Sequence, residues 1–147
     1  MINYYDKIKI IGDKKFILQT KKALSLIKNK SSVDFEKVEK WIKSVKSDNI
    51  SRIILKKAQF AVGEKTAYSE LEWYASTFVH EATHQYLHST KLLIWKSGNF
   101  YKHEKLCIDE QIRFLKSIKA KKQIINWCEG SLNRKHWNKS SIKKQSY

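Results

Sequence analysis

The pattern of hydrophobic and polar positions predicts a strand followed by two helices in residues 1–49. Residues 4–11 alternate enough for a half-buried strand, and the glycine that follows them marks a turn. Apolar residues then recur at helical spacing over residues 16–27. A second helix is predicted to begin with Ser32 or Asp34 as its cap. The buried stripe of that helix would consist of Phe35, Val38, Trp41, Ile42 and Val45.

Residues 50–69 change to an extended pattern. Two hydrophobic runs, 53–55 and 58–62, are typical of strands, and the pair Gly63 and Glu64 closes the second run. The sequence therefore predicts a small β-sheet or hairpin here. A strand at the edge of such a sheet can pair with an extended peptide, but the pattern leaves open which strand lies at the edge.

Residues 70–120 return to helical spacing and predict two long helices. The first has Ser69 and Glu72 as a predicted capping box. Its buried face is predicted to contain Leu71, Trp73, Tyr74, Phe78, Val79, Ala82, Tyr86 and Leu87. The second extends from His103 or Glu104 to Ala120. Its mostly apolar face is predicted to hold Leu106, Cys107, Ile108, Gln111, Phe114, Leu115 and Ile118.

Residues 121–147 predict one more short helix and a basic tail. The helix contains the apolar stretch 124–128 and ends near Gly130, and Trp137 is the expected anchor of the tail. No internal repeat or linker interrupts the chain. We therefore expect residues 1–147 to form one α+β domain, mainly helical, with the small β-sheet or hairpin before its central helix.

The central helix carries the sequence His80-Glu81-Ala82-Thr83-His84. His80 and His84 are four residues apart, so both imidazoles project from one face of a helix and can bind one metal ion. Glu81 can hold a water on that ion and accept its proton. This spacing is the HExxH pattern of zinc peptidases, which predicts Zn²⁺ as the cofactor.

A catalytic zinc site usually has a third protein ligand. The metzincin arrangement is excluded, because the required histidine position is occupied by Thr90. His88 would lie about 12 Å along the helix axis from His80, too far to share the ion, and is interpreted as a surface residue. Glu104 is the preferred third ligand, since it stands one turn before the small Cys107. Glu110 is the alternative, although it should face solvent more.

These residues carry a resemblance to gluzincin-type metallopeptidases, in particular to small HExxH domains in which a second helix reads E-x-x-(small)-x-x-x-Q-x-x-F-L. The residues that match this second pattern are Glu104, Cys107, Gln111, Phe114 and Leu115. The similarity covers roughly Trp73 to Ile118 and implies a zincin-like fold. It also implies His80, His84 and Glu104 as zinc ligands. Glu81 would be the general base, while substrate recognition is not carried over.

The reaction implied is hydrolysis of a peptide bond by a water that the metal activates and Glu81 deprotonates. A donor for the tetrahedral oxyanion is also needed. By residue type, the candidates are Tyr68, Tyr101, His103 and His136. We expect Glu81→Gln to keep the metal and lose hydrolysis.

Charge adds information about partners. The formal net charge is +16, which would raise encounter rates with acidic partners of any class. Because the lysines are spread along the whole chain, a solvated basic surface is favoured over a dedicated nucleic-acid groove. We expect a protein or peptide substrate. An acidic inhibitor or immunity protein would fit if the chain is a toxin or effector module. The alternative function is a basic nucleic-acid-associated protein with a structural or degenerate metal site.

The cysteines and the N-terminus bear on compartment. Cys107 and Cys128 form neither a CxxC pair nor a set of four, so two reduced, buried thiols are expected. The N-terminus has no basic segment followed by an apolar run, and no stretch approaches membrane-spanning length. We therefore expect a cytoplasmic protein with no membrane span, and export by a non-classical route stays open.

Overall fold

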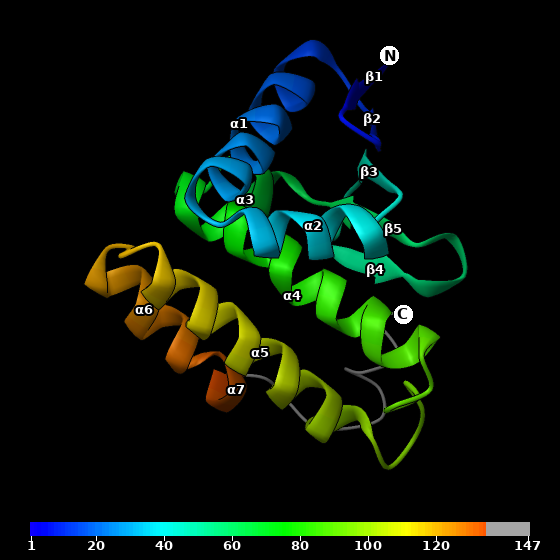
Figure 1. Cartoon of the computed structure of the whole chain (residues 1–147), viewed down its shortest axis with the longest axis vertical. Helices are drawn as coiled ribbons and strands as arrows, with labels where there is room; N and C mark the ends of the chain where they lie inside the picture. The colour runs from blue at the N-terminus through cyan, green and yellow to red at the C-terminus, as the bar shows by residue number, and fades with distance from the viewer. Residues whose placement is uncertain (135–147) are drawn as a thin grey trace.

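The computed structural model describes residues 1–134 and shows an α+β fold, as the sequence predicts. Helices account for most of the structure (Figure 1). The strands of a mixed sheet come before the two long helices at residues 71–89 and 100–117. The strands are β1 (Ile2–Tyr5), β2 (Ile8–Ile11), β3 (Ser44–Ser47), β4 (Arg52–Ile54) and β5 (Gln59–Val62). The helices are α1 (Lys14–Lys30), α2 (Ser32–Trp41), η1 (Leu55–Lys57), α3 (Glu64–Ala67), α4 (Leu71–Ser89), α5 (Phe100–Ser117), α6 (Lys122–Glu129) and α7 (Ser131–Arg134).

The strands form a five-stranded sheet in the order β1-β2-β3-β5-β4. The three central strands are parallel, and the two edge strands pair antiparallel to their neighbours. Ile10, Val45, Phe60 and Ile53 lie side by side across β2, β3, β5 and β4, and none of them is exposed. These four residues belong to the main hydrophobic core. They pack in one cluster with buried side chains from α1, α2 and α4.

The N-terminal third contains more strands than predicted. The predicted strand over residues 4–11 is a hairpin, because Asp6 adopts a left-handed conformation (φ 50°) and reverses the chain between β1 and β2. The second predicted helix is also too long, since Val45 belongs to the central strand β3. The spacing of Val45 in the sequence fits a helix stripe and a buried strand equally well. Its pairing within the sheet shows that it belongs to a strand.

Helix caps explain where the first two helices begin. The Asp13 side chain accepts a hydrogen bond from Phe16 N (2.8 Å) and caps α1. Ser31, and not the predicted Ser32 or Asp34, caps α2 by accepting from the amide of Asp34. Both caps satisfy backbone N–H groups that have no partner inside the helix.

Helix α4 runs through the middle of the molecule. It packs against α1, α2 and β4 on one side and against α5 on the other, and α5 in turn contacts α6 (Figure 1). The predicted capping box at its start is absent, because the Ser69 hydroxyl donates to the carbonyl of Thr66 instead. The central position of α4 explains why most of its side chains from Tyr74 to Leu87 are buried.

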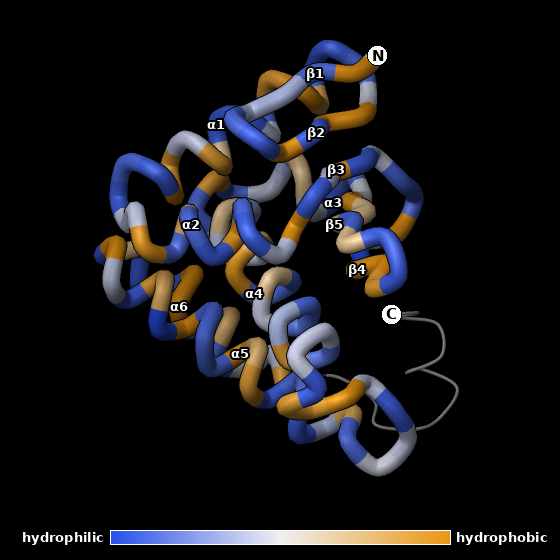
Figure 2. Tube along the Cα trace, turned by 45° about the vertical axis from the view of Figure 1, so that its right-hand side comes forward, coloured by the Kyte–Doolittle hydropathy of each residue, from blue (hydrophilic) through white to orange (hydrophobic). Residues whose placement is uncertain are grey.

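The C-terminal helices are amphipathic, and hydrophobic and hydrophilic residues alternate along α5 and α6 in Figure 2. Leu106, predicted on the buried face of α5, is instead 41% exposed. The predicted anchor Trp137 lies outside the described residues. Within residues 1–134, none of the helices combines the length and the apolar character needed to cross a membrane.

Candidate metal centre

His80 and His84 present their imidazoles on one face of α4. One helical turn separates them, and their ring centroids are 4.9 Å apart. His80 is 8% exposed and His84 is completely buried. Because α4 continues without interruption from Leu71 to Ser89, the helix itself fixes this spacing.

Glu104 reaches both histidines from α5. Its Oε1 atom lies 2.8 Å from His80 Nε2, and its Oε2 atom lies 3.2 Å from His84 Nε2. The Glu104 side chain has no exposed surface. The packing of α5 on α4 thus brings one carboxylate between the two Nε2 atoms.

The ring of His80 is held by a chain of hydrogen bonds. Its Nδ1 atom lies 2.8 Å from Oε1 of Gln111, and the Gln111 amide nitrogen donates to Ser76 Oγ (2.8 Å). The Ser76 hydroxyl donates in turn to the carbonyl of Trp73. An amide oxygen accepts only, so Nδ1 of His80 carries a proton, and Nε2 is the ring atom that faces Glu104.

The ring of His84 is held by a second histidine. Its Nδ1 atom lies 2.7 Å from Nδ1 of His103, which is also fully buried. Trp95, on the loop between α4 and α5, packs edge-on against both rings at 5.3 and 5.2 Å between centroids. Backbone N–H of Trp95 donates to Nδ1 of His88, which fixes this loop. His88 is therefore a half-buried structural residue, not the surface residue predicted.

Burial controls the charge of these groups. It lowers the pKa of His84 to about 3, despite the opposing effect of Glu104. It also lowers the pKa of His103 to about 4. For Glu104, burial alone would raise the pKa, but His80 and His84 hold the pKa of that carboxyl well below its usual value. At neutral pH the low pKa values keep His84 and His103 neutral and Glu104 ionised. A neutral imidazole and a carboxylate are the forms that bind metal.

Glu81 lies on the wall of a cavity at this centre. Its Oε1 atom is 3.9 Å from His80 Nε2, and the residue is 7% exposed. The cavity has a volume of about 120 Å³. It is lined by Trp73, Thr77, His80, Glu81, Glu104, Ile108, Gln111 and Ser131. Glu81 and the Glu104 carboxylate thus face the same small space.

Cys107 is a neighbour of the centre that was not among the ligands expected from the sequence. Its sulfur and one nitrogen each of His80 and His84 lie within 4.8 Å of one another. The signal was present, because Cys107 follows Glu104 by three residues and so shares its helix face. From the sequence, Cys107 was expected only as a small residue at a helix contact.

Glu110, the alternative third ligand, lies elsewhere. Its carboxylate pairs with Lys37 (3.2 Å) and Arg113 (3.1 Å), and its side chain is 36% exposed. Burial would raise its pKa, but Arg113 and Lys37 lower the pKa below its usual value. The structure therefore brings Glu104, and not Glu110, next to the two histidines.

The predicted oxyanion donors are dispersed. Tyr68 lies at the end of α3, beneath the Lys15 ammonium, and does not line the cavity. Tyr101 is 52% exposed at the start of α5 and does not line it either. His103 is engaged with His84, and His136 lies outside the described residues. None of the three described candidates occupies the position of an oxyanion donor in the cavity.

The residues present fit a zinc ion. Two imidazole nitrogens and a carboxylate oxygen form the donor set of many catalytic zinc sites. Both imidazoles are oriented by a second hydrogen bond at Nδ1, which is typical of histidines that bind metal through Nε2. Burial also excludes bulk water from the donors, so the arrangement suits a bound cation.

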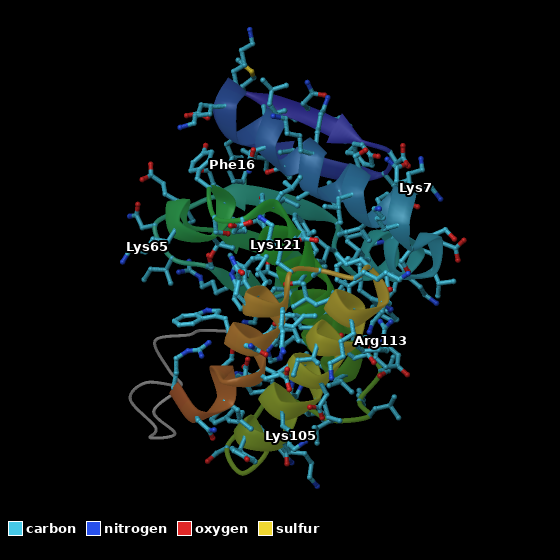
Figure 3. The ribbon with its side chains drawn as sticks, turned by 90° about the vertical axis from the view of Figure 1, so that its left-hand side faces the viewer. Lys7, Phe16, Lys65, Lys105, Arg113 and Lys121 are labelled. Atoms are coloured by element: carbon cyan, nitrogen blue, oxygen red, sulfur yellow. The ribbon has the colours of Figure 1, made fainter. Side chains whose placement is uncertain are left out.

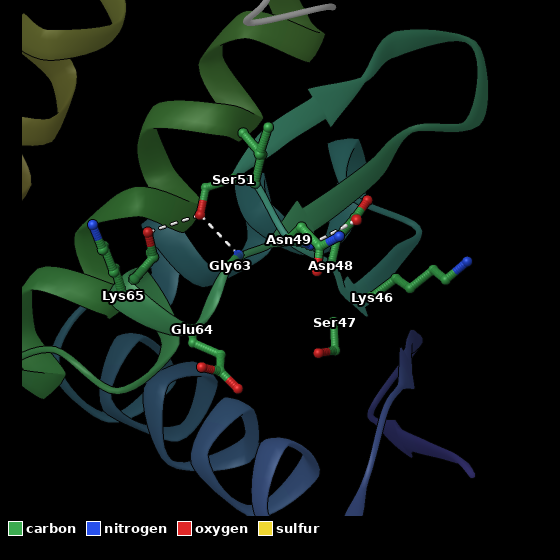
Figure 4. Close-up of a pocket in the computed structure, with 10 residues that line it drawn as sticks. Lys46, Ser47, Asp48, Asn49, Ser51, Gly63, Glu64 and Lys65 are labelled. Carbon is green, nitrogen blue, oxygen red and sulfur yellow. Dashed lines mark hydrogen bonds between the residues drawn. The ribbon is translucent and has the colours of Figure 1, made fainter.

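A larger cavity lies away from this centre, at the carboxyl ends of the parallel strands β3 and β5 (Figure 4). Ser51 Oγ bridges its wall by donating to Thr66 Oγ1 and accepting from the amide of Gly63. Neither histidine nor cysteine lines it. The residues with metal chemistry therefore belong to the smaller cavity on α4.

Comparison with known proteins found no matching family model, no matching curated protein and no matching solved structure.

Proposed function

We propose that this chain is a zinc-dependent peptidase in which His80, His84 and Glu104 hold the ion. The observation that carries the proposal is the position of the Glu104 carboxylate, 2.8 and 3.2 Å from the two Nε2 atoms, beside a cavity that Glu81 also lines. Gln111 and His103 keep the two rings oriented. Bound zinc supplies a Lewis acid and a water of lowered pKa.

Glu81 is the general base in this proposal. Its carboxylate takes the proton of the attacking water and later delivers it to the leaving amine. The near-complete burial of Glu81 keeps other water from competing for its oxygen atoms. Thr77 lies one turn earlier on the same face of α4 and lines the same cavity.

The sheet offers a surface for an extended substrate. Strand β4 lies at the sheet edge, and its two ends are tied to different parts of the helical layer. Ser51, before β4, donates to Thr66 of α3, while the carbonyl of Leu55, after β4, accepts from Gln85 of α4. Strand β4 is thus tied to α3 at one end and to α4 at the other, and it packs against α4. A peptide added to this edge would lie along α4.

Metal content and hydrolysis test the proposal together. The purified protein should contain about one zinc per chain, and it should cleave a pool of proteome-derived peptides analysed by mass spectrometry. Glu81→Gln should keep the zinc and lower kcat by about 10²- to 10⁴-fold, because a general base contributes that much. His84→Ala should lose the zinc.

Glu110→Gln is the matched control, since this half-buried carboxylate faces Lys37 and Arg113 rather than the cavity. It should keep both metal and activity. Full activity in Glu81→Gln would rule out the mechanism, and a protein that takes up no zinc when zinc is supplied would rule out the function.

The net charge of +16 supports a second candidate, binding to nucleic acid. Such binding should weaken steeply between 50 and 200 mM salt, by about 10³- to 10⁵-fold for six to ten phosphate contacts. It should also be indifferent to Glu81→Gln. A fluorescence titration of single- and double-stranded DNA with both proteins separates the two functions.

A further inference from the structure

A second apolar cavity adjoins the metal centre. It has a volume of about 420 Å³ and lies between α3, the start of α4, and α6. It is lined by Lys65, Thr66, Ser69, Glu70, Trp73, Gln123, Ile124 and Trp127. We call it the Trp73 pocket.

Trp73 connects this pocket to the proposed active site. Its side chain lines both the Trp73 pocket and the smaller cavity that holds Glu81. Trp73, Thr77 and His80 follow one another at spacings of four and three, so they form one line along α4. The two cavities are therefore neighbours along the first half of this helix, with Trp73 as their shared wall.

The walls of the pocket suit a large apolar side chain. Trp127 is 57% exposed although it is among the largest apolar residues, and the Arg134 guanidinium stacks on its ring at 3.6 Å. Ile124 and Trp73 belong to the apolar cluster beneath it. Exposed indole surface gains free energy when another apolar group covers it.

Charged groups stand only at the rim. Lys121 pairs with Glu70 at 3.1 Å, and both side chains are more than half exposed. In Figure 3, Lys65 extends from α3 at one side and Lys121 lies at the start of α6. An apolar floor with a charged rim favours a ligand that has an apolar side chain and a polar backbone.

We propose that the Trp73 pocket binds an aromatic or long aliphatic side chain of the peptide substrate, about three residues from the scissile bond. His80 follows Trp73 by seven helical positions, or about 10 Å at 1.5 Å per residue. An extended peptide covers this length with about three residues at 3.3 Å each. The inference rests on the proposed peptidase function, and it adds a substrate class.

Binding can be tested without catalysis. The zinc-loaded Glu81→Gln protein is titrated with N-acetyl-phenylalanine amide, and the five tryptophan indole N–H signals are followed by NMR. Signals are assigned with single Trp→Phe variants. The Trp73 and Trp127 signals should shift saturably, whereas Trp41, which packs against Tyr86 on the far side of α4, should not. N-acetyl-alanine amide should cause no saturable shift at the same concentrations.

Trp127→Ala should weaken this binding about tenfold, because the probe loses the apolar surface of one indole. Leu92→Ala is the matched control, since Leu92 is a 65% exposed apolar residue on the loop between α4 and α5. Circular dichroism checks that both variants fold. Equal responses to the two probes, or no response at Trp73 and Trp127, would overturn the proposal.

Cleavage sites in the peptide pool give the second measurement. Wild-type protein should prefer an aromatic or long aliphatic residue at one position about three residues from the cut, and Trp127→Ala should lose that preference. Hydrolysis without such a preference would overturn the pocket assignment and leave the peptidase standing. Probe binding without hydrolysis of any peptide would overturn the peptidase and the substrate role of the pocket. A shift of the Trp73 and Trp127 signals when only the protein concentration is raised would show that a second copy of the chain occupies the pocket. That result would also overturn the proposal.

Discussion

His84 and His103 face each other through their Nδ1 atoms at 2.7 Å, and both rings are fully buried. One of these nitrogens must donate and the other accept, because the low pKa of each ring keeps it neutral. If Nε2 of His84 is the metal-binding atom, the proton of His84 is on Nδ1. The acceptor is then Nδ1 of His103, whose own proton is on Nε2. A histidine thus fills the supporting position that a carboxylate or carbonyl usually occupies.

The first prediction concerns this supporting role. His103→Phe removes the acceptor and should weaken zinc binding about 10- to 100-fold, the usual cost of losing such a partner. His103→Asn retains an acceptor oxygen and should restore most of the affinity. Competition with a chromophoric chelator measures both values. Unchanged affinity in His103→Phe would show that the contact with His84 is only packing.

The second prediction concerns stability and pH in the metal-free protein. The folded-state pKa values of His84 and His103 are lowered to about 3 and about 4, while both are about 6.5 in the unfolded chain. Between these values the unfolded chain binds more protons than the folded one, so acid favours unfolding. The free energy of unfolding should fall as pH drops from about 6.5 towards 4.5, by up to about 1.4 kcal/mol per pH unit for each histidine.

Urea titrations at several pH values measure this slope. His103→Asn should reduce it by the contribution of one histidine, even though the variant has a different stability at neutral pH. A slope that is the same in the variant would contradict the assignment of His103 as a buried neutral imidazole.

The sequence was sufficient for the local part of the centre. His80, Glu81 and His84 share one helix, and the period of that helix places them. The position of Glu104 depends on how α5 packs on α4, which sequence spacing restricts but does not determine. His103 and Cys107 lie on the same helix as Glu104, but their contacts with His84 and His80 follow from the depth at which α5 inserts.

The fold was predicted in class but not in all its strands. The periodic helices were identified because each has a long apolar stripe. Strand β3 was missed because it is four residues long and follows α2 after only two residues. The turn at Asp6 was missed because neither glycine nor proline marks it. Short elements such as these are defined by their partners in the sheet.

The third prediction concerns Cys107, whose sulfur lies close to both histidines. If Glu104 is the third ligand, Cys107→Ala should keep one zinc per chain and lose only about 1–2 kcal/mol of stability from the buried space it leaves. The cobalt-substituted wild type should lack an intense thiolate-to-metal band in the near ultraviolet. Cys128→Ala is the control, because Cys128 is also buried but does not lie beside the two histidines. Loss of zinc in Cys107→Ala alone would make this sulfur a ligand.

The last prediction concerns the ion pair that joins α2 to the helix of Glu104. The Asp34 carboxylate is 5% exposed and accepts from Arg113 of α5 at 2.5 Å, and the pKa of Arg113 is raised by this contact. Asp34→Asn removes the buried charge and should lower the free energy of unfolding by about 1–3 kcal/mol. This is less than the full cost of breaking a buried ion pair, because Arg113 is half exposed. Asp109→Asn breaks an exposed pair with Lys105 and should change the free energy of unfolding by less than about 0.5 kcal/mol. Chemical denaturation compares the two variants. Equal losses would mean that the Asp34–Arg113 link between α2 and α5 contributes no more than a surface pair to the position of α5 that brings Glu104 to the histidines.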